Sequence, residues 1–218
     1  MNRRTLIFDM DGTLLDTLTD LTAALNHSLA YCDLPTRSID EARRFVGNGI
    51  RKLVERGVPE NTPPNIIDKA HAEFLRYYSV HCADSTQAYA GIAEALAALK
   101  AAGHRVAVVS NKNDAEVHSL VDTFFPNLMD AAAGVTPDVR PKPAPDMVLR
   151  VLKTLGSDES EAVYIGDSEV DLQTAVNANL PCVSVLWGFR ERAFLQERGA
   201  TCFIERPEEL AELFGEKA

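Results

Sequence analysis

A short apolar run that ends in a pair of aspartates constrains the fold of this chain more than any other stretch. Thr5–Phe8 has the length and side-chain types of a strand buried within a parallel sheet. Asp9 and Asp11 follow it directly, and Gly12 comes next. Because ligands bind at the carboxyl ends of the strands in open α/β sheets, we expect both carboxylates to face a binding crevice. Two acids held this close repel unless a cation or a shared proton compensates, so the pair predicts Mg²⁺ chemistry.

Three further polar clusters follow later segments. They are Ser110-Asn111-Lys112 after the apolar run 106–109, Lys142 between Pro141 and Pro143, and Gly166–Asp171 after the run 162–165. Ser110 and, more weakly, Asn111 have donors for phosphoryl oxygens, although a serine here suits a helix N-cap equally well. Lys142 can offset the charge of a nucleophile and a phosphate, although most lysines in a proline-rich loop are simply exposed.

These four motifs together resemble the haloacid dehalogenase superfamily, which uses an aspartate nucleophile, a hydroxyl, a lysine and an acidic metal pair. They occur in that family's order and span residues 9–171. Their spacing is most similar to that of the phosphoglycolate phosphatase group. The resemblance implies a Rossmann-like parallel sheet flanked by helices, with an inserted α-helical cap.

Attack on a phosphate ester needs a nucleophile and a proton for the leaving oxygen. Asp9 can attack phosphorus and form an aspartyl-phosphate, and Asp11 can protonate the leaving group and later activate water. We expect Thr13, in the turn after the pair, and Asn111 to contact the substrate.

The resemblance also implies a ligand set for Mg²⁺. Asp9, the backbone carbonyl of Asp11, and Asp167 would bind the ion directly, and Asp171 would bind through water or support the ligands from behind. An acid at Asp171 is equally typical of a helix that begins nearby. The sequence assigns no role to Glu169 or to Trp187-Gly188-Phe189.

The pattern of the chain divides it into two parts. From residue 86 onward, short apolar runs alternate with helical patterns, which predicts a parallel α/β sheet. Residues 17–85 have helical periodicity alone, so we expect a cap domain there and a catalytic core of residues 1–16 and 86–218. In the cap, Gly49 and Arg51 lie in a glycine-rich turn that offers N–H groups and a guanidinium to a substrate carboxylate. The alternative is an ordinary loop with solvated basic residues.

Composition narrows the partners. A net charge of −10 argues against a nucleic-acid or anionic-membrane surface. No apolar run approaches a membrane span of about 20 residues, and the acids Asp9 and Asp11 interrupt any signal-peptide pattern. The four cysteines lack paired spacing, which favours a reducing cytoplasm.

We therefore expect a cytoplasmic, Mg²⁺-dependent phosphatase, monomeric or homodimeric, that acts on a small phosphorylated metabolite, foremost 2-phosphoglycolate. One alternative is phosphoryl transfer of the β-phosphoglucomutase type, which uses the same aspartates. Another is a non-catalytic binding protein on the same fold.

Overall fold

A computed structural model describes residues 4–215 of the chain. The described residues form two compact units. One unit is the insertion Asp16–Gln87, and the other is built from the residues on either side of it.

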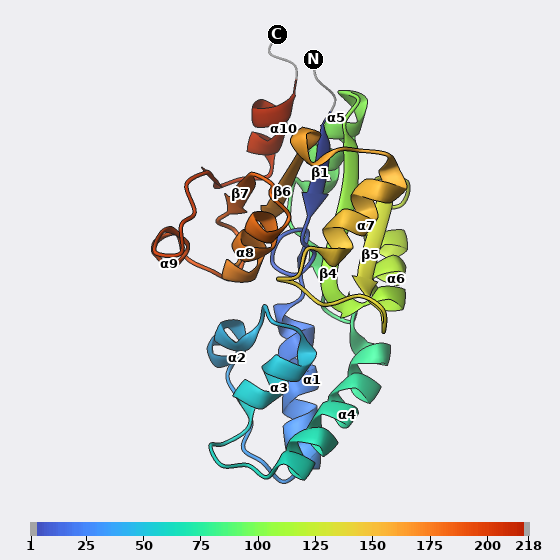
Figure 1. The fold of residues 1–218 in the computed structure, drawn as a ribbon. Coiled ribbons are helices and arrows are strands. Elements are labelled where there is room, and N and C mark those ends of the chain that lie inside the picture. Colours follow the sequence, from blue (N-terminus) through green and yellow to red (C-terminus); the bar gives the residue numbers. More distant parts are fainter. Residues whose placement is uncertain (1–3, 216–218) are drawn as a thin grey trace. The chain divides into compact units, whose positions relative to one another are not determined.

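The larger unit is built on a six-stranded sheet in the order β5-β4-β1-β6-β7-β8 (Figure 1). The strands are β1 (Thr5–Phe8), β4 (Arg105–Asn113), β5 (Ala131–Val135), β6 (Ala162–Gly166), β7 (Cys182–Val185) and β8 (Phe203–Ile204). Every neighbouring pair is parallel. In the centre, Phe8 of β1 pairs with Val108 on one side and Ile165 on the other. The predicted parallel α/β core is confirmed.

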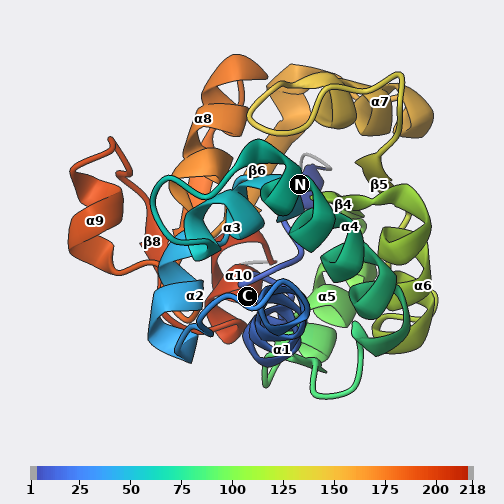
Figure 2. The same ribbon diagram turned by 90° about the horizontal axis from the view of Figure 1, so that it is seen from below.

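Helices cover both faces of this sheet (Figure 2). One face packs against α5 (Ile92–Ala101), α6 (Asp114–Phe124) and α10 (Glu208–Phe214), and the other against α7 (Asp146–Leu155) and α8 (Glu169–Asn177). Leu6 and Phe8 point to the first face, and Ile7 points to the second. A strand buried on both faces needs apolar residues at every position, which is why Thr5–Phe8 is continuously apolar in its interior.

The sequence pattern missed several short elements, among them β5, α9 (Arg192–Gln196) and a 3₁₀ turn at Glu159–Glu161. Strand β5 reads Ala-Ala-Ala-Gly-Val, and alanine and glycine have low strand propensity. Pairing with β4 and packing against α6 and α7 hold it in the sheet. Helix α8 begins at Glu169, because Ser168 forms its capping box with Asp171.

The smaller unit is helical. Its helices are α1 (Leu18–Tyr31), α2 (Ile39–Phe45), α3 (Ile50–Gly57) and α4 (Pro64–His81). Helices α1 and α4 pack together through buried positions at helical spacing, among them Leu25, Leu29 and Phe74. Helix α2 begins at a capping box, in which the Ser38 hydroxyl accepts from the Glu41 N–H and the Glu41 carboxylate accepts from the Ser38 N–H.

The two ends of this insertion are tied to each other. Two-residue strands β2 (Leu15–Asp16) and β3 (Gln87–Ala88) pair where the chain enters and leaves it. Inside the insertion, the buried carboxylate of Asp20 accepts hydrogen bonds from the backbone N–H groups of Ser85 and Thr86, and from the Thr86 hydroxyl. The start and the end of the helical unit are therefore fixed to one carboxylate.

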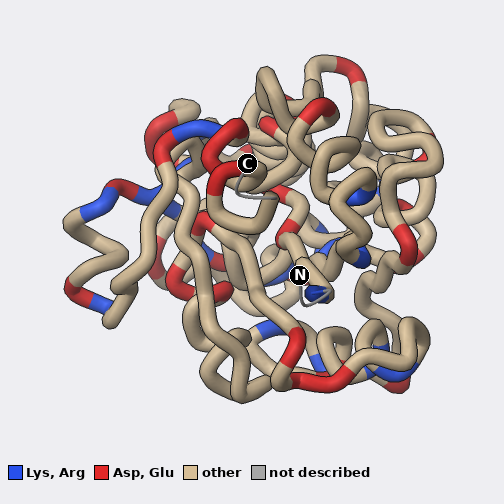
Figure 3. Tube along the Cα trace, turned by 90° about the horizontal axis from the view of Figure 1, so that it is seen from above, with Lys and Arg blue, Asp and Glu red and all other residues tan. Residues whose placement is uncertain are grey.

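Charged residues of both signs are interspersed along the chain trace (Figure 3). Among residues 4–215, no helix combines the length and apolarity that crossing a bilayer requires.

Candidate active site

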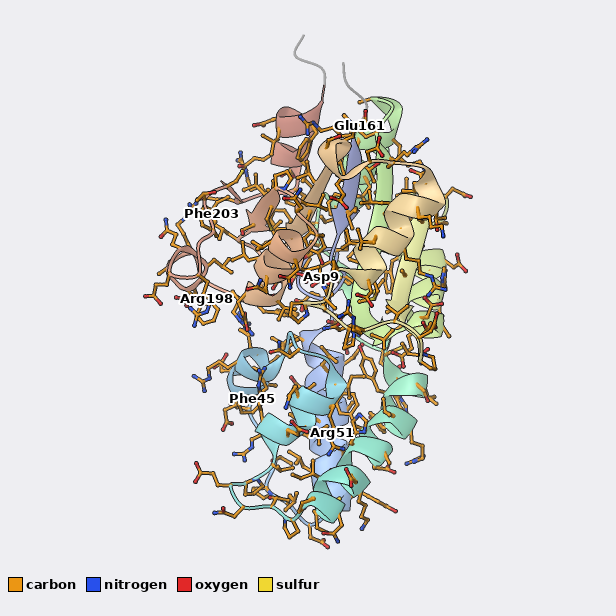
Figure 4. All side chains as sticks on the ribbon, in the orientation of Figure 1. Asp9, Phe45, Arg51, Glu161, Arg198 and Phe203 are labelled. Carbon is orange, nitrogen blue, oxygen red and sulfur yellow. The ribbon has the colours of Figure 1, made fainter. Side chains whose placement is uncertain are left out.

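The carboxyl end of β1 holds Asp9 within the larger unit (Figure 4). Asp9 is 7% exposed, and its backbone N–H donates to the Ile165 carbonyl, which continues the β1–β6 ladder past the strand. The chain then turns at Gly12, whose φ of +83° favours glycine. A side chain at this position would also meet the Asp167 carboxylate. The tight turn therefore brings Asp9 and Asp11 to the edge where the other strands end.

Lys142 lies in the centre of the site. It is 4% exposed, and its Nζ lies 2.6 Å from Asp9 Oδ1 and 2.9 Å from Asp171 Oδ1. The same ammonium donates to Tyr164 Oη at 3.1 Å, and Tyr164 donates in turn to Asp171 Oδ1 at 3.0 Å. Lys142 is thus a buried counter-ion of the predicted nucleophile and no exposed loop lysine.

Asn111 holds the backbone of Lys142 from the neighbouring segment. Its Nδ2 donates to the Lys142 carbonyl at 3.0 Å, and its Oδ1 accepts from the Lys142 N–H at 2.7 Å. The expected contact of Asn111 with substrate stays a prediction, whereas its amide positions the lysine in this structure. The Ser110 hydroxyl accepts from the Lys112 N–H and leaves the cap of α6 to Asn113. Ser110 is therefore no helix cap, and it lies buried inside a strand that continues to Asn113.

The third carboxylate is Asp167, directly after β6. Its Oδ2 accepts from the Phe189 N–H at 2.7 Å, and its Oδ1 lies 3.5 Å from the Thr13 hydroxyl. The ligand atoms of Asp9, Asp167 and Asp171 all lie within 4.8 Å of one another. These are three of the four predicted metal-binding residues, and the fourth, Asp11, was expected to contribute its backbone carbonyl.

Burial sets the electrostatics of this cluster. Burial and the Asp171 carboxylate raise the pKa of Asp9 well above its ordinary value, and Lys142 opposes them. Burial, followed by Asp171, raises the pKa of Asp167 to about 7. Burial would also raise the pKa of Asp171, but Lys142, Ser168 and Tyr164 together hold it below the ordinary value. Asp171 is therefore the ionised partner of Lys142. A further positive charge would be needed to keep Asp9 and Asp167 ionised as well.

Comparison with known proteins agrees with this geometry. The profile of the haloacid dehalogenase-like hydrolases matches residues 6–185. This chain is a haloacid dehalogenase-like hydrolase. Phosphoglycolate phosphatase from Mesorhizobium japonicum is 34% identical over 88% of the chain and 86% of the relative, and that from Caulobacter vibrioides is 37% identical over 88% and 82%.

Solved structures of similar proteins agree as well. A Lactobacillus delbrueckii protein proposed to be a phosphoglycolate phosphatase superimposes with a TM-score of 0.94 at 35% identity, over 98% of this chain and 99% of that one. CbbY from Rhodobacter sphaeroides, solved in complex with phosphate, has a TM-score of 0.72 at 25% identity, over 96% of each chain.

The sequence pattern assigned no role to two residues of this site. Lys112 is 3% exposed, and its Nζ lies 3.1 Å from Asp11 Oδ1. It belongs to the polar run Ser110–Lys112, so its position just after the apolar run 106–109 was the available signal. The second, Tyr164, is fully buried and contacts both Lys142 and Asp171. A phenol in an otherwise aliphatic strand is a signal, since a buried hydroxyl needs a polar partner.

The helical unit contains the remaining predicted residues. Gly49 has a φ of +83° and precedes the first residue of α3, as a glycine-rich turn requires. Arg51 follows in the first turn of α3 (Figure 4). Its guanidinium pairs with Glu55 at 2.9 Å and with Asp68 of α4 at 2.6 Å. The side chain is 42% exposed, so the surface of the unit presents a guanidinium already flanked by two carboxylates.

Proposed function

We propose that this hydrolase is a Mg²⁺-dependent phosphatase that cleaves a small phosphate monoester through an aspartyl-phosphate on Asp9. The observation that carries the proposal is the 2.6 Å contact between Asp9 Oδ1 and the buried Lys142 ammonium. An aspartate fixed in this way is oriented as a nucleophile. The charge beside it favours the approach of a phosphate dianion.

The carboxylate cluster fits a divalent cation. Lys142 supplies one positive charge to the buried acids Asp9, Asp167 and Asp171. Mg²⁺ prefers oxygen ligands and takes one or two carboxylates together with phosphate oxygens. We propose that Asp9, Asp167 and the Asp11 backbone carbonyl hold the ion, with Asp171 behind them. The bound ion would neutralise charge on the phosphoryl oxygens and polarise phosphorus.

The first step transfers the phosphoryl group to Asp9. A carboxylate oxygen of Asp9 forms a bond to phosphorus while the bond to the ester oxygen breaks. Asp11 gives its proton to the leaving oxygen, so the alcohol departs neutral. We propose that Ser110, in the neighbouring strand β4, donates to a phosphoryl oxygen, and that the Thr13 hydroxyl does the same.

The second step releases phosphate. Asp11 takes a proton from water, and the water oxygen attacks phosphorus of the aspartyl-phosphate. The bond between phosphorus and the Asp9 oxygen breaks, which regenerates the free carboxylate. The pair Lys112–Asp11 keeps the acid and base in place through both steps. Uncatalysed phosphate monoester hydrolysis is so slow that accelerations reach about 10²¹-fold, which no single group supplies.

We propose 2-phosphoglycolate as the substrate. The relatives with this name support it, since they align over 88% of this chain. We further propose that residues 17–85 act as a cap domain on the core 1–16 and 86–218, and that Gly49 and Arg51 recognise the substrate carboxylate. A substrate carboxylate would compete with Glu55 and Asp68 for that guanidinium.

The alternatives have less support. A β-phosphoglucomutase-type transfer is not favoured, because the relatives from Mesorhizobium japonicum and Caulobacter vibrioides are both phosphoglycolate phosphatases by name. A non-catalytic protein on this fold would need no buried lysine aimed at Asp9. We also propose a cytoplasmic location and a monomeric or homodimeric state. Free cysteines at 32, 82, 182 and 202 are compatible with a reducing compartment.

A phosphate-release assay over phosphorylated metabolites, with Mg²⁺ present, tests the proposal. We expect 2-phosphoglycolate to have the highest kcat/KM, and acid-quenched enzyme to carry a phosphoryl group on the peptide that contains Asp9. A requirement for a sugar bisphosphate would instead identify a mutase. An absence of turnover on every ester, with Mg²⁺ present and the protein folded, would reject the phosphatase.

A further inference from the structure

The loop that follows β7 contacts two separate parts of the site. This loop, Trp187–Arg190, is called the β7 loop below. Its Trp187 side chain donates from Nε1 to the Thr13 carbonyl at 2.9 Å. Its Phe189 N–H donates to Asp167 Oδ2 at 2.7 Å. One loop thus holds the turn after the Asp9–Asp11 pair and a predicted metal ligand.

Packing around Gly188 leaves no room for a side chain at that position. A Cβ built on Gly188 would overlap the Asp167 side chain and the Gly12 carbonyl oxygen. A Cβ built on Gly12 would in turn lie 2.9 Å from the Phe189 ring and would overlap the Asp167 carboxylate. The two glycines and Asp167 therefore pack at the closest approach that their atoms allow.

The far end of the β7 loop is anchored as well. Arg190 is 9% exposed, and its Nε donates to Glu169 Oε2 at 3.0 Å. Glu169 is the first residue of α8, two positions after Asp167. The β7 loop is therefore fixed on the α8 side by Arg190 and on the β1 side by Trp187.

We propose that the β7 loop is a positioning element of the metal site: it fixes the orientation of the Asp167 carboxylate and its distance from the Gly12–Thr13 turn, and thereby sets the affinity for Mg²⁺. The inference rests on the proposed metal dependence. Mg²⁺ demands near-ideal octahedral geometry, so a small rotation of one carboxylate is costly. The hydrogen bond to Oδ2 fixes the orientation of the whole carboxylate, including Oδ1, which lies 3.5 Å from the Thr13 hydroxyl. Groups that orient a ligand in this way typically change metal affinity 10–100-fold when removed.

Two variants and one control test the proposal by calorimetric titration with Mg²⁺ and by the Mg²⁺-induced rise in Tm. Trp187→Phe keeps an aromatic ring but removes the single N–H that binds Thr13. Gly188→Ala displaces Asp167. The control, Gly103→Ala, alters a glycine with a φ of +85° whose added Cβ would meet no atom within 4 Å. This substitution strains the backbone at a position away from the site, and so measures how a loss of stability alone affects Mg²⁺ binding.

We expect Trp187→Phe to raise the Kd for Mg²⁺ about tenfold or more, and Gly188→Ala to raise it further. Gly103→Ala should lower Tm and leave the Kd unchanged. Trp187 is also the single tryptophan of the chain. Its fluorescence emission should therefore change when the wild type is titrated with Mg²⁺, with the same midpoint as the calorimetric titration.

Wild-type Kd values in Trp187→Phe and Gly188→Ala, or equal losses in all three variants, would overturn the proposal. If Gly188→Ala fails to fold, Trp187→Phe decides alone. A wild type that binds Mg²⁺ with the predicted loop dependence but hydrolyses no ester would refute the proposed function and support this inference. A wild type that binds no divalent cation would overturn both.

Discussion

Oδ1 of Asp9 lies 2.6 Å from the ammonium of Lys142, and both side chains are buried. Oδ1 also accepts the Met10 N–H at 2.6 Å, so two donors converge on one carboxylate oxygen. The proposed nucleophile is thereby oriented before any substrate arrives, which would save the entropy of fixing it during the reaction.

Replacement of Asp9, the proposed nucleophile, should remove activity without unfolding the chain. We expect Asp9→Asn to retain less than about 1% of wild-type phosphate release, because an amide is a far poorer nucleophile than a carboxylate. Burial disfavours the charge of Asp9, and Lys142 keeps Asp171 as a partner, so the melting temperature should change little. Asp16→Asn, an exposed acid in β2, is the matched control. More than a few percent of activity in a clean preparation would remove Asp9 from the nucleophile role.

The role of Asp11 depends on the leaving group. We expect Asp11→Asn to reduce kcat/KM on an alkyl phosphate by about 10²–10⁴-fold, the usual contribution of an acid or base. The loss on p-nitrophenyl phosphate should be much smaller, because its leaving group departs without a proton. Steady-state rates on the two substrates decide this, and equal losses would exclude proton donation by Asp11.

The two acids after β6 should differ in their effect on the metal. Activity should vanish with EDTA and return with Mg²⁺. We expect Asp167→Ala to weaken Mg²⁺ binding more than Asp171→Ala does, because the Asp171 oxygens already accept from Lys142, Tyr164 and Ser168. Asp171→Ala should instead lower the free energy of unfolding by about 3 kcal/mol, the cost of breaking a buried ion pair. The reverse order in a metal titration would contradict this ranking.

Arg51 should affect one class of substrate. We expect Arg51→Ala to lower kcat/KM for 2-phosphoglycolate by about 10–10³-fold, on the order of 1–4 kcal/mol, as a charge-assisted hydrogen bond is lost. Activity on p-nitrophenyl phosphate, which has no carboxylate, should hardly change. Lys52→Ala is the matched control, since Lys52 also pairs with Glu55 and lies in the same helical turn. Equal losses on both substrates would make Arg51 structural.

The helical unit should respond to acid through Glu73. Hydrogen bonds from Arg76 and His27 lower the pKa of Glu73 from 4.5 to about 2. A carboxyl group whose pKa is lower in the folded state than in the unfolded state stabilises the fold at pH values above the unfolded pKa. This contribution is lost as the pH falls from about 4.5 to about 2. We expect the stability difference between wild type and Glu73→Gln to shrink over this interval in urea titrations. A constant difference would contradict the assignment.

The sequence predicted the elements that local pattern determines. Thr5–Phe8 and the run 162–165 are continuously apolar because each is buried on both faces of the sheet. Asp9 and Asp167 follow these strands, and parallel neighbours bring their carboxyl ends to one edge. Adjacency of the two carboxylates therefore followed from the pattern alone.

Contacts between segments far apart in the sequence could not be predicted from the sequence pattern. The Asn111–Lys142 pair spans 31 positions, and the Trp187–Thr13 bond spans 174. The spacing of residue types along the chain does not predict either hydrogen bond. Strand β5 escaped for a related reason, because its alanines gain their strand conformation from β4, α6 and α7 and not from intrinsic propensity.

The carboxylate of Asp20 joins the two ends of the helical unit. Because Asp20 binds Ser85 and Thr86, the first and last residues of the unit lie close together in space, next to the paired strands β2 and β3. A segment with adjacent ends can be lengthened, shortened or exchanged while β1 keeps its register with β4 and β6. If the helical unit recognises the substrate as proposed, a new insertion between Leu15 and Ala88 would change the substrate that is recognised and would leave Asp9 and Lys142 in place.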